Sequence, residues 1–191
     1  MAFFLATAAN DFFGGTVFDL GDTVSYALAS STTPFTGVRV SLSLAGPQAT
    51  LGSGLDTFVS IENLIGSSFD DVLSGNAGNN VLDGGAGIDT VSYANAGSAV
   101  TVSLAVAGAQ NTFGAGIDTL LNVENLTGSN FGDRLTGNAA NNLIDGGGGN
   151  DLLDGGAGSD SLIGGAGDDI INGDRKSTRL NSSHSSVSRM P

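Results

Sequence analysis

Residues 146–172 read GGGGNDLLD, GGAGSDSLI and GGAGDDIIN, which are three consecutive copies of one nine-residue pattern. Each copy has glycine at its first, second and fourth positions and aspartate at its sixth, followed by a short stretch with a central aliphatic residue. A period this short indicates that one small structural unit is stacked many times, with one carboxylate at the same point in every unit.

The glycines and the aliphatic residues predict how each unit folds. Three glycines within six residues allow backbone angles that other residues avoid, so the first six positions predict a tight turn. The remaining three positions can form a very short strand, in which Leu153, Leu162 and Ile171 point to one side. One unit cannot bury its aliphatic side chain alone. The predicted fold class is therefore all-β: a parallel β-roll, or β-solenoid, with an aliphatic ladder inside and turns along two edges.

The turns bring aspartate carboxylates and backbone carbonyls together. Calcium is a hard cation that takes about six to eight oxygen ligands of these two kinds. The repeats offer no nitrogen or sulfur ligand, which argues against zinc or copper. We therefore predict Ca²⁺ as the cofactor, and the alternative is that the aspartates are solvated turn residues. Three further aspartates at the ninth position (Asp83, Asp145 and Asp154) are predicted to cap glycine N–H groups of the next turn.

The pattern resembles the glycine- and aspartate-rich nonapeptide repeat of the RTX family of secreted calcium-binding proteins. The resemblance implies that successive turns alternate between two edges, so that a calcium site forms between repeats two apart. In the array it pairs Asp151 with Asp169 and with Asp133, and it pairs Asp160 with Asn142, where a neutral amide implies a weaker site.

Looser copies of the repeat precede the array. Residues 66–92 read GSSFDDVLS, GNAGNNVLD and GGAGIDTVS, where Asp71 and Asp89 lie two repeats apart and could share one ion. Ordinary turns between strands are the alternative for this earlier set. The predicted metal-ligating residues are Asp71, Asp89, Asp133, Asn142, Asp151, Asp160 and Asp169.

A second repeat is much longer. Residues 40–80 and 102–142 align at a constant offset of 62 residues, and the motif DTVSY at 22–26 recurs at 89–93. The alternation VTVSL at 100–104 has the two-residue period of a strand, so we expect these stretches to be longer rungs of the same solenoid. The predicted organisation is a lead at 1–14, a first module at 15–87, and a second module with the array at 88–173. We expect four aromatic residues in the core or in stacking contacts: Tyr26, Phe69, Tyr93 and Phe131.

The last eighteen residues differ from the rest. Residues 174–191 hold four of the six basic residues and the only histidine, and they have no repeat. Residues 174–184 and 188–191 resemble the translation of a widely used short-read sequencing adapter. We therefore expect this segment to be a non-native, disordered tail, and exclude it from the reasoning about the fold.

Without that tail, the chain has eighteen acidic and two basic residues, a net charge of −16. Such a surface argues against nucleic acid and anionic membranes as partners and favours cations. Glycine accounts for 31 of 191 residues, more than twice the roughly 7% of average proteins. There is no cysteine for a disulfide framework, and we expect neither a cleaved signal peptide nor a membrane span.

The predicted function is that of a calcium-binding repeat protein rather than an enzyme. The resemblance implies export by a type I secretion system, a secreted or cell-surface location, and folding on extracellular calcium. Residues 1–173 contain no histidine or cysteine for a nucleophilic triad, and the adjacent pairs Asp70–Asp71 and Asp168–Asp169 are already explained by the repeat. Two alternatives stay open: the repeats could be an accessory region of a larger secreted hydrolase, or of a surface adhesin.

Overall fold

A computed structural model describes residues 1–7, 11–15, 21–29, 37–50, 54–174 and 176–180 of this chain. The described residues form short strands joined by turns and bends, and none of them lies in a helix. Accordingly, no helix among them is long and apolar enough to cross a membrane. The chain divides into two compact units, one formed by Met1–Val91 with Asp118–Val123, and the other by Ser92–Ile117 with Glu124–Pro191.

The first unit is built from three groups of strands. One group is parallel throughout and has the order β1 (Phe3–Leu5), β3 (Thr23–Ser25), β7 (Asn63–Ile65), β9 (Val81–Asp83) and β13 (Ile117–Leu121). A second parallel group has the order β4 (Arg39–Ser41), β8 (Val72–Ser74) and β10 (Thr90–Ser92). In the third group, β6 (Leu55–Val59) pairs in parallel with β2 (Phe12–Gly14) and antiparallel with β5 (Gln48–Ala49).

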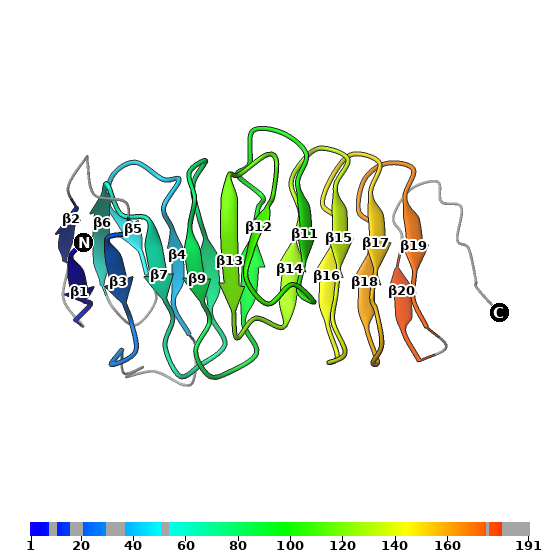
Figure 1. The fold of residues 1–191 in the computed structure, drawn as a ribbon, viewed down its shortest axis with the longest axis horizontal. Helices are drawn as coiled ribbons and strands as arrows, with labels where there is room; N and C mark the ends of the chain where they lie inside the picture. The colour runs from blue at the N-terminus through cyan, green and yellow to red at the C-terminus, as the bar shows by residue number, and fades with distance from the viewer. Residues whose placement is uncertain (8–10, 16–20, 30–36, 51–53, 175, 181–191) are drawn as a thin grey trace. The chain divides into compact units, whose positions relative to one another are not determined.

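The second unit contains the array of nonapeptides, seen as the yellow-to-orange strands of Figure 1. One of its parallel groups has the order β11 (Thr101–Ser103), β15 (Arg134–Thr136), β17 (Leu152–Asp154) and β19 (Ile170–Asn172). The other has the order β14 (Asn125–Thr127), β16 (Leu143–Asp145), β18 (Ser161–Ile163) and β20 (Thr178–Leu180). The unit also includes β12 (Ala109–Asn111). Consecutive repeats therefore lie on opposite faces, and each strand pairs with the strand two repeats away.

The register of these pairs stacks the aliphatic residues in line. Leu153 pairs with Leu135 on one side and with Ile171 on the other, and Ile144 pairs with Leu162 on the opposite face. All five side chains are fully buried. Burial of a leucine or isoleucine contributes about 1.5–3 kcal/mol, so the ladder is the main apolar stabilisation of a unit this thin. The predicted all-β parallel β-roll is confirmed.

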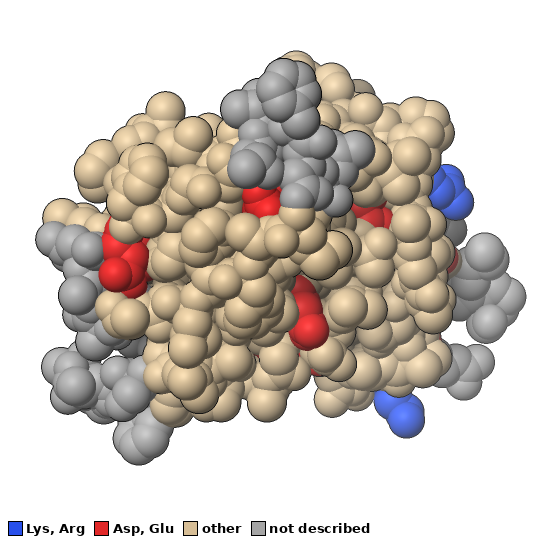
Figure 2. Space-filling model, turned by 60° about the vertical axis from the view of Figure 1, so that its left-hand side comes forward, with Lys and Arg blue, Asp and Glu red and all other residues tan. Residues whose placement is uncertain are grey.

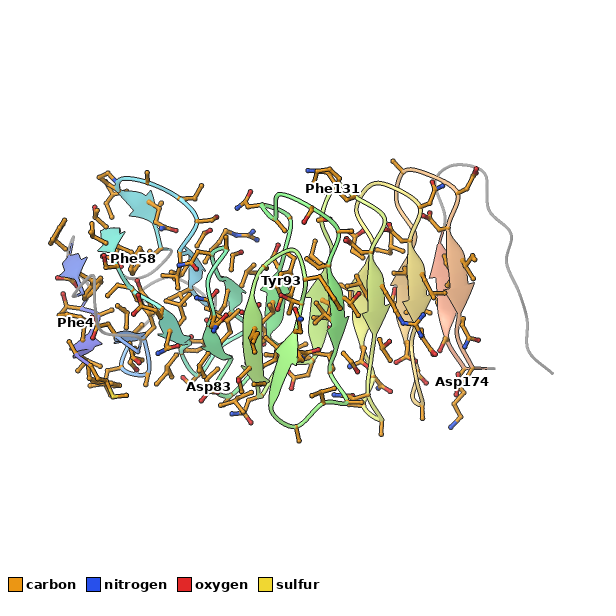
Figure 3. All side chains as sticks on the ribbon, turned by 45° about the horizontal axis from the view of Figure 1, so that its top comes forward. Phe4, Phe58, Asp83, Tyr93, Phe131 and Asp174 are labelled. Carbon is orange, nitrogen blue, oxygen red and sulfur yellow. The ribbon has the colours of Figure 1, made fainter. Side chains whose placement is uncertain are left out.

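The longer modules also supply rungs. The DTVSY motif contains β3, and β7 begins within the ENL motif; these strands pair in parallel with Thr23 opposite Asn63. Tyr26 and Tyr93, which end the two DTVSY motifs, are buried as expected. Phe131 is 45% exposed, against the expectation of a core position, because it occupies a turn rather than a strand (Figure 3). Phe69, in the matching turn, is half-buried.

The structure differs from the expected disordered tail at one point. β20 (Thr178–Leu180) continues the array, with its strand parallel to β18. An outer strand offers unpaired N–H and C=O groups to whatever chain follows it, which explains this pairing without any repeat motif. Residues 175 and 181–191 of the predicted tail lie outside the described residues.

Candidate metal centre

The sixth residue of each nonapeptide lies at the end of its turn, immediately before the strand. The side chains of all seven predicted ligands are buried: Asp71, Asp89, Asp133, Asn142, Asp151, Asp160 and Asp169. Each carboxylate folds back beneath its own turn. A Cβ on Gly146 would overlap Asp151 Oδ2, and a Cβ on Gly164 would overlap Asp169 Oδ2. The first glycine of the pattern is therefore required by the carboxylate, and not only by the turn.

The structure brings together every pair of residues that the resemblance implies. The Asp133 amide donates to Asp151 Oδ1 at 2.8 Å, and the Asp151 amide donates to Asp169 Oδ1 at 3.0 Å. On the other edge, the Asn142 amide donates to Asp160 Oδ1 at 3.0 Å. In the first unit, the Asp71 amide donates to Asp89 Oδ1 at 2.7 Å. Each of these contacts spans eighteen residues, which is two repeats.

Two carboxylates of the second unit have an oxygen atom without a hydrogen-bond partner. Asp151 Oδ2 and Asp169 Oδ2 are buried and accept no hydrogen bond, although buried polar atoms are nearly always paired. Burial, together with the neighbouring carboxylates of Asp133 and Asp169, raises the pKa of Asp151 to about 6. An anionic oxygen with no donor is destabilising unless a proton or a cation approaches it.

Backbone carbonyls converge on the same place. Asp151 Oδ2 and the carbonyl oxygen of Gly164 both approach the side of Gly146 where a Cβ would stand. No group of three or more Asp, Glu, His or Cys side chains that could hold a metal occurs within the described ranges. An ion at these turns would therefore take much of its coordination from carbonyl oxygens, which suits calcium and not zinc. Asp151 and Asp169 fit such an ion.

The other predicted ligands of the second unit have their side-chain atoms occupied. Asp133 Oδ1 accepts from the Val100 amide at 2.7 Å and from Ser129 Oγ at 2.8 Å, while its Oδ2 accepts from the Ser129 amide. Asn142 Nδ2 donates to the Glu124 carbonyl at 2.7 Å. Asp160 Oδ2 accepts from Ser177 Oγ at 3.1 Å.

In the first unit, Asp71 repeats the arrangement of Asp133. Its Oδ1 accepts from the Val38 amide at 2.6 Å and from Ser67 Oγ at 2.8 Å, and its Oδ2 accepts from the Ser67 amide. Burial raises the pKa of Asp71, an effect that these hydrogen bonds oppose. Calcium ligation by Asp71, Asp133 and Asn142 stays a prediction, and their observed partners belong to the protein itself.

The aspartates at the ninth position behave as predicted. Asp83, Asp145 and Asp154 accept hydrogen bonds from the amides of Gly85, Gly147 and Gly156, at 3.2, 3.1 and 3.1 Å. Each of these glycines opens the following turn as its second residue. The predicted capping role is confirmed. Figure 3 shows Asp83 at the edge of the first unit.

Buried carboxylates outside the nonapeptides were missed by the sequence reasoning. Asp118 Oδ1 accepts from the Asn80 amide at 3.0 Å. In the array, the sixth-position carboxylate two repeats further along makes this contact, so Asp118 takes the role of that carboxylate for Asn80. Asp56 accepts from Tyr26 Oη at 2.9 Å and from Thr50 Oγ1 at 2.8 Å, and all three side chains are buried. Burial, followed by the charge of Asp56, raises the pKa of Tyr26. The motifs GSGLDT and GAGIDT, which share the Gly-x-Asp ending of the nonapeptide, are a signal that would have found Asp56 and Asp118.

The acidic side chains reach the surface only in part. On the face that Figure 2 shows, carboxylates emerge in small separate patches among neutral residues. This agrees with the burial of the sixth-position aspartates, whose exposed fractions are 3% or less.

Three segments of the chain, residues 60–91, 127–162 and 153–175, match the family described as the RTX calcium-binding nonapeptide repeat (4 copies). These segments are RTX calcium-binding repeats. They contain all seven predicted ligands, and they confirm both the resemblance and Ca²⁺ as the cofactor. A comparison with curated proteins gives no match. The chain therefore contains calcium-binding repeats.

Proposed function

We propose that the RTX repeats of this protein fold when they bind extracellular calcium, after the chain has left the cell unfolded through a type I secretion system. The observation that carries this proposal is the pair of buried, unpartnered oxygens, Asp151 Oδ2 and Asp169 Oδ2. In the folded array these oxygens need a positive charge. Calcium supplies that charge outside the cell, where it is plentiful.

Without calcium, two terms oppose folding of the array. The carboxylates of Asp133, Asp151 and Asp169 lie two repeats apart on one edge, and the negative charges of Asp133 and Asp169 repel that of Asp151. The glycine-rich turns also lose more backbone entropy on folding than other residues would. When calcium binds, its binding free energy becomes folding free energy.

The expected affinity follows from the class of site. Extracellular calcium modules bind at about 10⁻⁴ to 10⁻³ M. At a hundredfold excess over the dissociation constant, each site would add about 2.7 kcal/mol of stability. A few such sites exceed the net stability of many small domains, so calcium would decide whether the array is folded.

The test is a calcium titration of the full chain in EDTA-treated buffer, followed by far-UV circular dichroism. We expect a change from coil to β signal at millimolar calcium, and no comparable change with magnesium, which demands octahedral geometry and retains its water. A β signal that is equally strong in EDTA and in calcium would disprove calcium-driven folding. The variant with both Asp151→Asn and Asp169→Asn should need more calcium than the wild type for the same signal.

We also propose that the repeats have a structural role rather than a catalytic one. The adjacent carboxylates Asp70 and Asp71 do not form a pair: Asp71 is buried, whereas Asp70 is exposed and its Oδ1 accepts from the Ile88 amide at 2.8 Å. Asp70 thus stabilises the outer side of the turn. Such a structural array would serve equally in a surface adhesin or beside a secreted hydrolase, and a hydrolase assay on the full chain is expected to show no activity.

A further inference from the structure

The nonapeptide turns of this protein fall into two classes that differ at their second residue. In the repeats starting at Gly84, Gly146, Gly155 and Gly164 the second residue is glycine, and in the repeats starting at Gly66, Gly75, Gly128 and Gly137 it is serine or asparagine. The order is the same in both long modules: one serine turn, then one asparagine turn, then the glycine turns.

The backbone separates the same two classes. The second-position glycines Gly85, Gly147, Gly156 and Gly165 have φ angles of 95°, 88°, 80° and 93°, and the fourth-position glycines of these repeats are also left-handed. None of Ser67, Asn76, Ser129 and Asn138 has a positive φ. Gly78 is decisive, because it is a fourth-position glycine in an asparagine turn and it is not left-handed. The left-handed turn therefore accompanies glycine at the second position, and a fourth-position glycine alone does not produce it.

In a serine turn, the second residue closes the turn with its own side chain. Ser129 Oγ accepts from the Phe131 amide at 3.0 Å and donates to Asp133 Oδ1 at 2.8 Å. The Val100 amide, 33 residues earlier and immediately before β11, donates to the same oxygen. Ser67 closes the turn of Asp71 in the same way.

In an asparagine turn, side-chain amides make the contacts that close the turn. Asn138 Oδ1 accepts from the Ala140 amide at 2.8 Å, and Asn142 Oδ1 accepts from the Asn138 amide at 2.9 Å. Asn142 Nδ2 then donates to the Glu124 carbonyl at 2.7 Å. The first module repeats these contacts with Asn80 and the Glu62 carbonyl, also at 2.7 Å.

A glycine turn has no side chain with which to close. The second residue of the Asp151 and Asp169 repeats lacks a hydroxyl, and each of these two carboxylates has an unpartnered Oδ2. The Asp160 repeat is also a glycine turn, and its Oδ2 accepts from Ser177 Oγ, which lies after the array and not in the turn. Because N–H and O–H donors and a cation seek the same oxygen lone pairs, a turn that is already closed by donors excludes the ion.

We propose that the second residue of each nonapeptide decides whether its turn takes calcium: glycine turns bind the ion, and the Ser67, Asn76, Ser129 and Asn138 turns are metal-free caps that start each array. The caps are ordered without calcium and present the first strands on which the calcium-dependent turns stack. A repeat gains stability only from its neighbours, so an ordered cap lowers the number of repeats that must form together. This inference rests on the proposed calcium-driven folding, and it replaces the prediction from the sequence that Asp71, Asp133 and Asn142 ligate calcium.

The test compares two identical substitutions two repeats apart in the full chain, Asp133→Asn and Asp151→Asn. Bound calcium is counted by isothermal titration calorimetry. Protection of the Val100 amide is measured by hydrogen exchange in EDTA. Asp151→Asn is expected to bind fewer calcium ions than the wild type and to leave Val100 protected. Asp133→Asn is expected to bind as many calcium ions as the wild type, and to lose protection at Val100 by at least about tenfold.

A third variant is the control for the possibility that Asp133→Asn prevents the chain from folding. Ser129→Ala removes the hydroxyl donor and leaves the carboxylate of Asp133 in place, so it should also reduce Val100 protection in EDTA without changing the calcium count. If Asp133→Asn loses as many calcium ions as Asp151→Asn, or if Val100 is unprotected in wild-type EDTA samples, the caps do not exist as proposed. A wild-type chain that binds no calcium would instead overturn the proposed function itself.

Discussion

Residues 128–145 and residues 146–172 stack the same nine-residue unit but close its turn by different means. Both regions bury an aliphatic residue at the eighth position, with Leu135 and Ile144 in the first and Leu153, Leu162 and Ile171 in the second. The first region satisfies Asp133 with a protein donor, Ser129 Oγ, and Asn142 with a protein acceptor, the Glu124 carbonyl. The second leaves Asp151 Oδ2 and Asp169 Oδ2 without a partner. The comparison teaches that the strand ladder tolerates either turn, and that the metal requirement is a property of the turn.

The largest expected effect comes from the ladder itself, in the variants Leu135→Ala and Leu153→Ala. Each removes a fully buried side chain and should cost about 3 kcal/mol of stability in calcium, measured by urea denaturation. In EDTA the two variants should differ in the structure that they lose. Only the region around Leu135 is proposed to be ordered without calcium, so only Leu135→Ala should lose structure there. Equal losses of structure in EDTA for both variants would contradict the proposed difference between the two regions in their need for calcium.

A slightly smaller effect is expected for Asn142→Asp, which exchanges a donor for a charge. The Glu124 carbonyl loses the hydrogen bond from Nδ2, and a second carboxylate is placed against Asp160. In EDTA the variant should lose about 1–3 kcal/mol, measured from the urea midpoint. The matched control is Asn141→Asp, which makes the same change at an exposed neighbour and should be close to neutral. A neutral Asn142→Asp would show that the amide does not close the turn.

The pH dependence of the calcium response tests the glycine turns. Because the folded metal-free array raises the pKa of Asp151 to about 6, it holds more protons than the unfolded chain between about pH 4 and 6. Its stability in EDTA should therefore fall as pH rises from about 4 to 6. Protons compete with calcium for the same oxygen, so the calcium midpoint in circular dichroism should be roughly tenfold higher at pH 5 than at pH 7. Asp151→Asn should flatten both dependences, and an unchanged pH response in that variant would exclude Asp151 as the titrating group.

The smallest expected effect is that of Asp154→Ala. It removes the hydrogen bond to the Gly156 amide, a partly exposed cap, and should lower stability in calcium by about 0.5–1 kcal/mol in urea denaturation. Asp168→Ala, at an exposed carboxylate five positions into its repeat, is the control and should change stability less. A loss of calcium ions from Asp154→Ala would assign this carboxylate to metal binding instead of capping.

Much of the fold follows from the period of the repeat. The ladder of Leu153, Leu162 and Ile171 was predictable because one aliphatic residue recurs every nine positions and a three-residue strand has only one inward position. The capping by Asp145 and Asp154 was predictable because it is a local contact between residues two apart. The pairing of Asp151 with Asp169 required the alternation of edges, which the resemblance to the RTX repeat supplied.

The remaining features depend on contacts that no local pattern contains. The Val100 amide reaches Asp133 across 33 residues, and the Asp118 carboxylate reaches Asn80 across 38. β20 pairs with β18 without any repeat motif of its own, because the outer strand has unpaired hydrogen-bonding groups.

The amino-acid sequence by itself determined the stacked unit, its inward side chains and the positions of its carboxylates, because these follow from residue type at a fixed spacing. Only the tertiary structure decided which distant backbone donors reach each carboxylate. An oxygen's partners come from whatever backbone and side chains the stack places beside it, so Asp133 and Asp151, alike in the repeat, have different surroundings.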